Sequence, residues 1–357
     1  MRQMKYLPVS LLIGLLTVYS SCKNYVAPKK PDPNDPSLLD WLIPKSQIIN
    51  RGIKDSIHSI DNPVFAYLGQ TTLNDNDLVI GVNVQGEFRV YPEKILGYHE
   101  VVNDVIKNKN ITLSYSPLTG TSLAWDATNI KGITTTFSPT TYLYNCNNIL
   151  FDKTAASYWQ QIYSECVAGN FQTSFVTGFP VVETSWANWK SMFPGAKVLA
   201  PPTGYKYNYS QDPFAGYTAT DSLYFLTTPV DKRLPLKEKV LGLVVGGRAK
   251  VYRFSSFADS LSVVKDNFQG LDVVVAGSQS RNFMVCYERR SGNNAVHGLA
   301  PDSEASNIIM ADSTGTRWDI FGTAVDGPLK GQKLNLTYSM MGYWFAFGAM
   351  YPDALIY

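Results

Sequence analysis

Residues Asp77 to Asp126 read DLVIGVNVQGEFRVYPEKILGYHEVVNDVIKNKNITLSYSPLTGTSLAWD. A second, divergent version of this stretch begins 161 residues later. The residues matched at that spacing are Gly81 with Gly242, Gly86 with Gly247, Val90 with Val251 and Tyr91 with Tyr252. One residue is then lost from the second version, and the spacing becomes 160. Self-similarity at a fixed spacing indicates a structural unit that occurs twice.

The similarity continues to the C-terminus. Further matched features are Asp152 with Asp312, Trp159 with Trp318 to within one residue, and Trp186–Pro194 with Tyr343–Pro352. The sequence therefore predicts two tandem, divergent copies of one unit of roughly 150 residues. We place the copies at residues 61–199 and 237–357, and residues 200–236, rich in Pro and Tyr, form the junction between them.

Each copy has the pattern of mainly β structure. Apolar runs on either side of Gly86 and Gly247 predict an opening hairpin in each copy. The predicted helices are short: 92–107, 254–268, and one within residues 185–194, with Ser185 as the cap and Pro194 as the stop. Further strands are predicted at residues 111–115, 122–125, 133–137 and 141–144. The predicted class is mainly β with short helices (α+β), each unit being a sandwich or a barrel.

The N-terminus has the form of an export signal. Two basic residues are followed by an apolar run at residues 7–18 and by the tripeptide Ser-Ser-Cys that ends at Cys22. This resembles a bacterial lipoprotein signal, residues 1–22, in which the cysteine is acylated and becomes the new N-terminus. A plain secretory signal with an incidental Cys22 is the alternative. Residues 23–60 are predicted to begin as a Pro-rich tether, which would hold the folded part at the bacterial cell envelope, periplasmic or on the outer-membrane surface.

Composition and charge exclude some functional classes. The chain is 45% hydrophobic and 17% charged, which is ordinary for a globular protein. Without the two basic residues of the signal, the chain has 29 basic and 29 acidic residues. A balanced surface argues against nucleic acid as a partner.

Cysteine and histidine usage bounds the chemistry. Apart from Cys22 the cysteines are Cys146, Cys166 and Cys286, an odd number that allows at most one intramolecular disulfide. Buried free thiols are the favoured interpretation. No cysteine pair has metal-ligand spacing and the chain has three histidines, so neither a metal site nor a cofactor is predicted.

At this point the motifs carry a family resemblance. They are VYPEKILGYHEVVND, SPLTGT, LFDKTAASYWQ, DKRLPLKEKV, TGTRWDIFG and WFAFGAMYPDALIY. In this order, from about Asn62 to the C-terminus, they resemble the bacterial domain-of-unknown-function family 3179. The resemblance implies an exported or membrane-associated protein and brings no established activity. Where that family usually has Cys-Pro-Leu-Cys-Gly-Thr, this chain has Ser116 and Thr119 in place of the cysteines, which removes thiolate redox or metal chemistry here.

The repeat also sorts candidate site residues, because polar groups present in only one copy are better candidates than shared ones. At the spacing of 161, four polar residues of the first copy stand opposite Ser260, Leu261, Val264 and Lys265; they are His99, Glu100, Asn103 and Asp104. On the predicted helix, His99 shares a face with Asn103, and Glu100 with Asp104. An imidazole beside carboxylates suits a general base or a polar-ligand anchor. A solvated helix face with a capping role is the alternative.

Two further candidates follow. The turn SPLTGT carries the hydroxyls of Ser116, Thr119 and Thr121, which suit a polar ligand, or a nucleophile if His99 lies nearby. The alternative is a turn whose hydroxyls bond to the local backbone. The junction is aromatic, with Tyr205, Tyr207, Tyr209, Phe214, Tyr217 and Tyr224. These rings suit stacking on sugars or peptides, or packing between the two units.

Two functional classes stay open from the sequence. The first is a non-catalytic exported lipoprotein that binds a small molecule, a glycan or a protein partner. The second is a periplasmic or surface enzyme that uses His99 with Glu100 or Asp104 near the turn from Ser116 to Thr121. Geometry discriminates between them, because the enzyme needs His99 and this turn to face one pocket.

Overall fold

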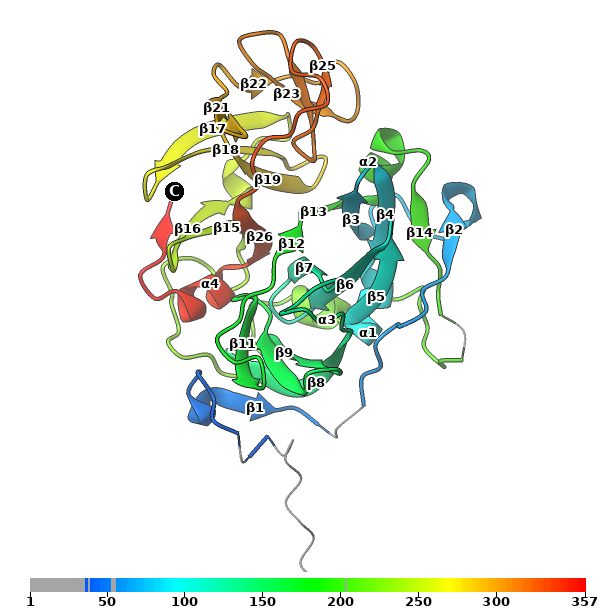
Figure 1. The fold of residues 1–357 in the computed structure, drawn as a ribbon, viewed down its shortest axis with the longest axis vertical. Helices are drawn as coiled ribbons and strands as arrows, with labels where there is room; N and C mark the ends of the chain where they lie inside the picture. The colour runs from blue at the N-terminus through cyan, green and yellow to red at the C-terminus, as the bar shows by residue number, and fades with distance from the viewer. Residues whose placement is uncertain (1–35, 38, 53–55, 203) are drawn as a thin grey trace, which may run out of the picture. The chain divides into compact units, whose positions relative to one another are not determined.

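A computed structural model describes residues 36–37, 39–52, 56–202 and 204–357, of which residues 39–357 form one compact unit (Figure 1). The export signal, Cys22 and most of the tether lie outside the described residues. The described part is mainly β, as predicted, with a few short helices. Its sheets are open and sandwich-like, and none of those described closes into a barrel. We call residues 61–199 the first half and residues 237–357 the second half.

Three sheets belong to the first half. One has the order β13 (Val181–Ser185), β3 (Leu78–Val84), β4 (Glu87–Pro92), β14 (Lys197–Leu199) and β2 (Phe65–Tyr67). The next has the order β12 (Gly178–Phe179), β7 (Thr121–Asp126), β6 (Lys109–Ser116) and β5 (Val101–Ile106). The third has the order β1 (Ile48–Asn50), β8 (Phe137–Tyr144), β9 (Asn147–Asp152), β10 (Ser157–Gln160) and β11 (Glu165–Gly169).

The second half has corresponding sheets. The first is β26 (Tyr338–Tyr343), β15 (Lys239–Val245), β16 (Arg248–Arg253) and β27 (Leu355–Ile356). The others are β17 (Ser262–Phe268), β18 (Leu271–Ser278) and β19 (Phe283–Glu288), then β22 (Ala300–Pro301), β23 (Ile308–Ala311), β24 (Arg317–Asp319) and β25 (Ala324–Asp326), with a small pair β20 (Arg290–Ser291) and β21 (Asn294–Ala295). The helices are α1 (Glu93–His99), α2 (Trp186–Met192), α3 (Ala215–Thr218) and α4 (Trp344–Met350), and the 3-10 turns are η1 (Lys45–Gln47), η2 (Leu68–Gln70) and η3 (Phe254–Ser256).

The strand connections of the two halves match. In each half the opening hairpin has an antiparallel neighbour on one side, β13 or β26, and a parallel neighbour on the other, β14 or β27. A seven-residue helix, α2 or α4, joins those two neighbours. The tandem duplication itself stays a prediction, and these matching connections are what it requires.

Two of the repeated glycines have the same physical reason in both halves. A Cβ on Gly81 would lie 1.9 Å from the ring of Trp189, and one on Gly242 would lie 2.0 Å from the ring of Phe347. Each ring comes from the helix that follows, α2 or α4, so only glycine lets that helix lie flat on the hairpin.

The predicted helix at residues 92–107 is wrong beyond His99. Glu100 adopts the left-handed conformation, with φ at 57°, and ends α1. The chain then continues as β5, which suits the β-branched residues that follow. The predicted helix at 254–268 is replaced by η3 and β17, and of the strand predicted at 133–137 only an isolated bridge at Ile133 and the start of β8 form. Helix α2 is confirmed, and the Ser185 side chain caps it by accepting a hydrogen bond from the backbone N–H of Asn188.

Two hydrophobic cores cross the boundary between the halves. One contains Trp125 and Trp159 of the first half with Phe347 of the second. The other joins Trp189 to Trp318 of the second half. Because each core contains side chains from both halves, the two halves are held at a fixed distance from each other.

Candidate functional site

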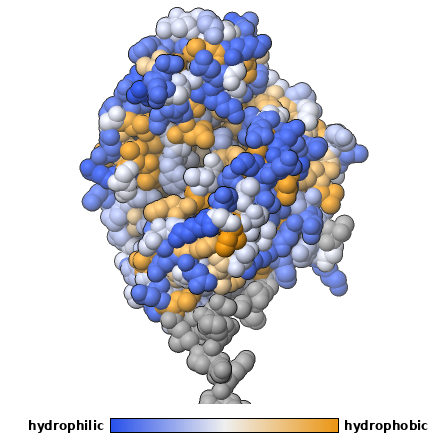
Figure 2. Space-filling view, in the orientation of Figure 1, coloured by the Kyte–Doolittle hydropathy of each residue, from blue (hydrophilic) through white to orange (hydrophobic). Residues whose placement is uncertain are grey.

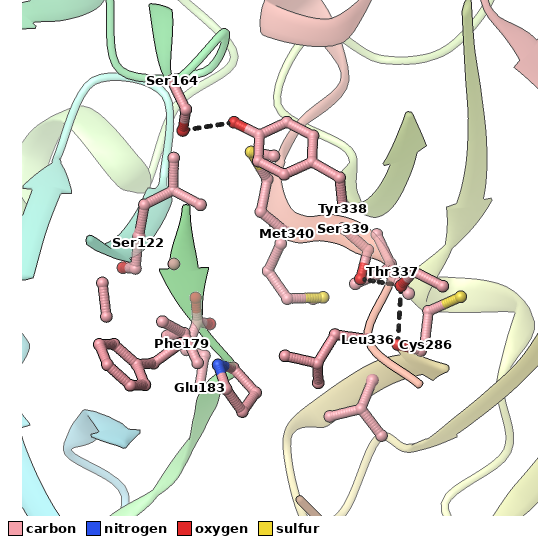
Figure 3. A pocket seen from close by; sticks show the side chains of 18 of the residues that line it. Ser122, Ser164, Phe179, Glu183, Cys286, Leu336, Thr337, Tyr338, Ser339 and Met340 are labelled. Atoms are coloured by element: carbon pink, nitrogen blue, oxygen red, sulfur yellow. Dashed lines mark hydrogen bonds between the residues drawn. The ribbon is translucent and has the colours of Figure 1, made fainter. Parts of the chain in front are cut away.

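A cavity of about 330 Å³ lies between the two halves (Figure 3). Strand β7, strand β12 and the start of β13 form one wall. Strand β19 and residues 336–341 form the other. In the space-filling view, apolar residues border the hollowed centre of this face (Figure 2). We call this space the first cavity.

Both walls of the first cavity have polar side chains among the apolar ones; they include Ser122, Ser164, Thr177, Glu183, Thr337, Tyr338 and Ser339. The Ser122 hydroxyl is buried and has no hydrogen-bond partner. Across the cavity, Tyr338 lies 2.7 Å from the Ser164 hydroxyl, which also accepts from the indole N–H of Trp125 at 2.9 Å. Neighbouring atoms cover the Ser122 oxygen, and a ligand that moves them aside would give the hydroxyl a partner.

A second cavity, of about 600 Å³, adjoins the first. It is lined by residues around β11, by Val244 with the Gly246–Gly247 turn, and by Met350 and Tyr351 at the end of α4. Ser164, Val176 and Tyr338 line both cavities.

The described residues that line the two cavities include two carboxylates and no lysine, arginine or histidine. Glu183, in the first cavity, forms an ion pair with Lys239. Glu165 lines the second, and burial raises the pKa of its carboxyl group. Burial also raises the pKa of the Cys286 thiol to about 12, so this thiol in the wall stays protonated at neutral pH.

Glu93, at the start of α1, lies beside the same ion pair. The Tyr115 hydroxyl donates to an oxygen of its carboxyl group at 3.4 Å. Burial, followed by the nearby Glu183 carboxylate, raises the pKa of Glu93 to about 8. Glu93 is therefore mainly protonated at neutral pH, which limits the negative charge around Glu183.

The sequence-predicted His99 is buried and points elsewhere. Its Nδ1 lies 2.7 Å from the carbonyl oxygen of His58, which only accepts, so Nδ1 carries the proton. Its Nε2, 2.6 Å from the Tyr209 hydroxyl, is then the acceptor. Burial lowers the pKa of His99 and favours this neutral form. Both ring nitrogens are occupied, and His99 lines neither cavity.

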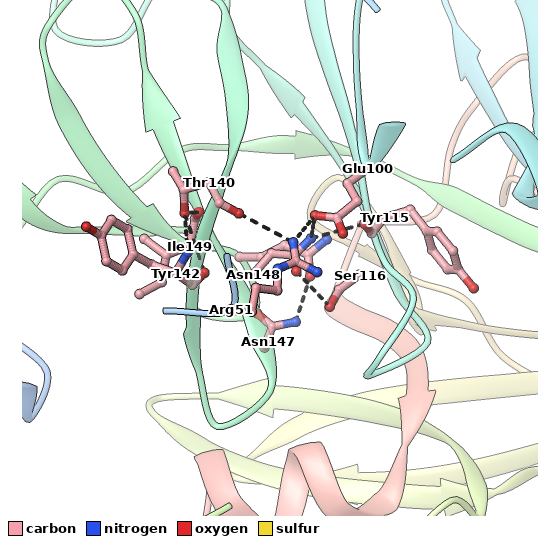
Figure 4. Close-up of polar contacts among 10 residues, drawn as sticks. Arg51, Glu100, Tyr115, Ser116, Thr140, Tyr142, Asn147, Asn148 and Ile149 are labelled. Carbon is pink, nitrogen blue, oxygen red and sulfur yellow. Dashed lines mark hydrogen bonds and ion pairs between the residues drawn. The ribbon is translucent and has the colours of Figure 1, made fainter. Parts of the chain in front are cut away.

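Glu100 and Ser116 do meet, through Asn148 (Figure 4). The Asn148 amide donates to the Glu100 carboxylate at 3.0 Å and its oxygen accepts from the Ser116 hydroxyl at 3.3 Å. Arg51, from the segment before the first half, donates to the same carboxylate at 2.6 Å. Glu100 is 2% exposed, so the pair with Arg51 is a buried one.

Thr119 and Thr121 belong to a neighbouring buried network. Their hydroxyls lie 2.9 Å apart, and the Asn147 amide donates to each of them at 2.9 and 3.0 Å. Thr121 also donates to the Gln161 side chain at 2.7 Å. The turn hydroxyls therefore bond to amide side chains from β9 and the segment after β10, rather than to their own backbone.

Asn103 and Asp104 lie on β5, so the shared helix face predicted for His99 and Asn103 is wrong. Asn103 donates to Asp61 at 2.7 Å and to the carbonyl oxygen of Phe137 at 2.8 Å. Asp104 accepts from Tyr91 at 2.7 Å and pairs with Arg89 at 3.2 Å.

The hairpin registers also correct the alignment at Asp104. A two-residue turn with positive φ follows Ile106 in the first half and Phe268 in the second. When these turns are aligned, Asp104 corresponds to Asp266 rather than to Lys265. Asp266 accepts from Tyr252 at 2.7 Å, as Asp104 does from Tyr91. Both halves therefore have an aspartate at this position, so Asp104 no longer counts as a polar residue present in only one copy.

One segment covers three of the sequence-predicted residues. Arg51 and His58 lie upstream of the first half and Asp61 is its first residue; they are the partners of Glu100, His99 and Asn103, respectively. The same segment joins the third sheet as β1, which pairs with β8. The predicted residues thus fasten the N-terminal segment to the first half.

The aromatic junction divides between two places. The rings of Tyr205, Tyr207 and Tyr209 gather around His99, at centroid distances of 4.8, 5.5 and 5.7 Å. Tyr217 is buried, and its hydroxyl donates to the Leu118 carbonyl at 2.9 Å. Tyr224 is 60% exposed.

Sequence reasoning missed the cavity residues Ser122, Ser164 and Tyr338. They come from three distant segments, and none stands in a motif with catalytic spacing. Three thiols, Cys146, Cys166 and Cys286, are free and buried, as the favoured interpretation held. Within residues 36–37, 39–52, 56–202 and 204–357, no cluster of three His, Cys, Asp or Glu side chains could hold a metal ion, and no helix is long and apolar enough to cross a bilayer.

A family model described as "Protein of unknown function (DUF3179)" matches residues 54–354. The chain belongs to this family. No curated protein and no solved structure matches it. In this DUF3179 member Ser116 and Thr119, of the SPLTGT motif, are both fully buried and hydrogen-bonded to amide side chains.

Proposed function

We propose that this protein is a non-catalytic binding protein of the bacterial cell envelope, anchored through lipid on Cys22, that holds a small molecule between its two halves. The observation that carries the proposal is the first cavity, with a buried Ser122 hydroxyl that has no partner. A volume of about 330 Å³ is in the range of small-molecule sites, which favours that ligand class over a glycan chain or a protein surface.

The enzyme alternative rests on His99. A general base needs a free ring nitrogen within reach of its substrate. Both nitrogens of His99 are bonded inside the protein, and the cavities lie elsewhere. The geometry therefore favours binding over catalysis by this residue.

A thermal-shift screen of the purified protein against uncharged small molecules tests the binding proposal. A ligand that binds only the folded state raises Tm. Ser122→Leu fills the cavity and should abolish the shift, whereas Ser191→Leu, the same change at an exposed position on α2, should leave it intact. Equal shifts in both variants, or none in the unaltered protein, would refute binding at this cavity.

Fractionation tests the anchor. Cys22→Ala should move the protein from the membrane fraction to the soluble fraction, because the acyl chains are lost. Mass spectrometry of the mature N-terminus is the direct measurement. An unmodified N-terminus at another residue would end the proposal that Cys22 carries lipid.

A further inference from the structure

The two cavities meet at one side chain. Tyr338, on β26, lines both of them together with Ser164 and Val176. Its hydroxyl donates to the carbonyl oxygen of Ile162 at 2.6 Å, so the phenol oxygen accepts from Ser164 at 2.7 Å. In Figure 3 the ring of Tyr338 reaches across from the second half to Ser164 of the first.

Both bonds of Tyr338 end on one short segment, residues 162–164, between β10 and β11. The residues that line both cavities are Ser164, Val176 and Tyr338, and of these Tyr338 has the largest side chain. Rotation of one side chain, at the loss of two hydrogen bonds, would therefore join the cavities.

We propose that the two cavities form one groove and that its ligand is an elongated, uncharged, mainly apolar molecule with one hydrogen-bonding end group, lying past Tyr338. This rests on the proposed function, because it takes the first cavity as the place where binding begins. The end group bonds to the Ser122 hydroxyl, and the chain extends into the second cavity.

Charge sets the first part of this ligand class. An anionic head group would meet Glu183 and Glu165 and no lysine, arginine or histidine among the described lining residues. Lys239 already neutralises Glu183, so a cation gains little there. An uncharged ligand avoids both the repulsion and the cost of stripping water from an ion.

The walls set the second part. Met284, Met340 and Met341 line the first cavity, and their unbranched thioethers adapt to the outline of a flexible chain. Each cavity also has a large exposed apolar side chain, Leu336 in the first at 49% exposure and Phe175 in the second at 66%. Apolar surface that extends through both cavities suits a long molecule rather than a compact one.

Calorimetric titration with 1-hexanol, 1-decanol and decanoate tests the proposal on the purified protein. Decanol should bind about tenfold or more tightly than hexanol, because each buried methylene adds to binding. Decanoate, with the same chain and a charged head, should bind at least about tenfold more weakly than decanol. Decanoate binding as tight as decanol would overturn the charge argument.

Variants separate the groove from the first cavity. Val244→Phe narrows the second cavity and should weaken the binding of decanol while leaving the affinity for hexanol unchanged. Ser122→Leu should weaken both. If Val244→Phe leaves the affinity for decanol unchanged, the proposal of one groove is wrong, while binding in the first cavity stands. If Ser122→Leu leaves the affinity for hexanol unchanged, the proposed function itself fails.

Two further variants keep the test decisive. Should Val244→Phe unfold the protein, Val244→Ala enlarges the second cavity instead and should tighten decanol alone. Tyr338→Phe removes the two hydrogen bonds but keeps the ring, and should tighten decanol severalfold without changing hexanol. Equal changes for both alcohols in either variant would contradict a groove divided by Tyr338.

Discussion

Two hairpins with the same register, β6–β7 and β18–β19, have different interiors. Their end pairs, Ser116 with Thr121 and Ser278 with Phe283, set the correspondence. Buried hydroxyls of the first hairpin stand where the second has apolar side chains; the positions are Thr112 and Val274, Ser114 and Ala276, and Thr121 and Phe283. One backbone pattern therefore carries a polar interior in one half and an apolar interior in the other.

The stability of each half therefore depends on different interactions. An apolar interior gains stability from area buried and tolerates changes that conserve volume. A polar interior must have every group bonded, because an unpaired buried group costs about 1–3 kcal/mol. In the first half Asn147, Asn148 and Gln161 bond the turn hydroxyls and Arg51 of the N-terminal segment pairs with Glu100, while Ser122 is left without a partner. It is thus the half in which single polar changes should matter most.

The largest expected effect is one that the halves share. Trp159 and Trp318 are both fully buried, at 0% exposure, on corresponding strands β10 and β24. Trp159→Ala and Trp318→Ala should each lower the free energy of unfolding by about 3–5 kcal/mol, since each leaves a large cavity. Urea denaturation measures both. A loss below about 1 kcal/mol in either half would break the structural likeness of the two halves at this position.

A smaller effect should separate the halves. Arg51→Met leaves the buried Glu100 carboxylate without its cation, and we expect a loss of about 2–3 kcal/mol, because Arg51 keeps some contact with solvent. The control is Arg289→Met in the second half, where the partner Asp272 is 57% exposed and the loss should be clearly smaller. Similar losses for the two variants would show that burial does not distinguish these pairs.

Much of the fold was predictable from local rules. The opening hairpins follow from apolar runs around Gly86 and Gly247, both with positive φ as a tight turn requires. Helix α2 follows from Ser185 and Pro194. These signals act over a few residues, so one sequence contains them in full.

The end of α1 could not be read in the same way. Residues 93–106 have helix-compatible spacing, and Glu100 is not a residue type that usually marks a left-handed stop. What stops the helix is tertiary: the Glu100 carboxylate is held by Arg51 and Asn148, and β5 pairs with β6. The site candidates inherited this error, since their shared face existed only on the predicted helix.

The cavities were beyond the sequence for a different reason. Ser122, Ser164 and Tyr338 line one cavity because two hydrophobic cores hold the halves face to face. No spacing along the chain encodes that meeting. The polar residues that did look distinctive serve instead to bind the N-terminal segment and to satisfy one another.

The smallest expected difference lies at the same two tryptophans. In the second half the indole N–H of Trp318 donates to Asp312 at 3.1 Å. In the first half Trp159 pairs with Leu150 on the neighbouring strand as Trp318 does with Met310, yet its N–H and one oxygen of Asp152 are both buried without a partner.

Phenylalanine removes the N–H and keeps most of the ring. Trp318→Phe loses a charged hydrogen bond and leaves Asp312 short of a donor, whereas Trp159→Phe removes a donor that was unsatisfied already. We therefore expect Trp318→Phe to cost about 1–2 kcal/mol more than Trp159→Phe in urea denaturation. Equal costs, or a larger one for Trp159, would mean that the first-half indole does have a bond in solution, and the contrast between the two interiors would not extend to this pair.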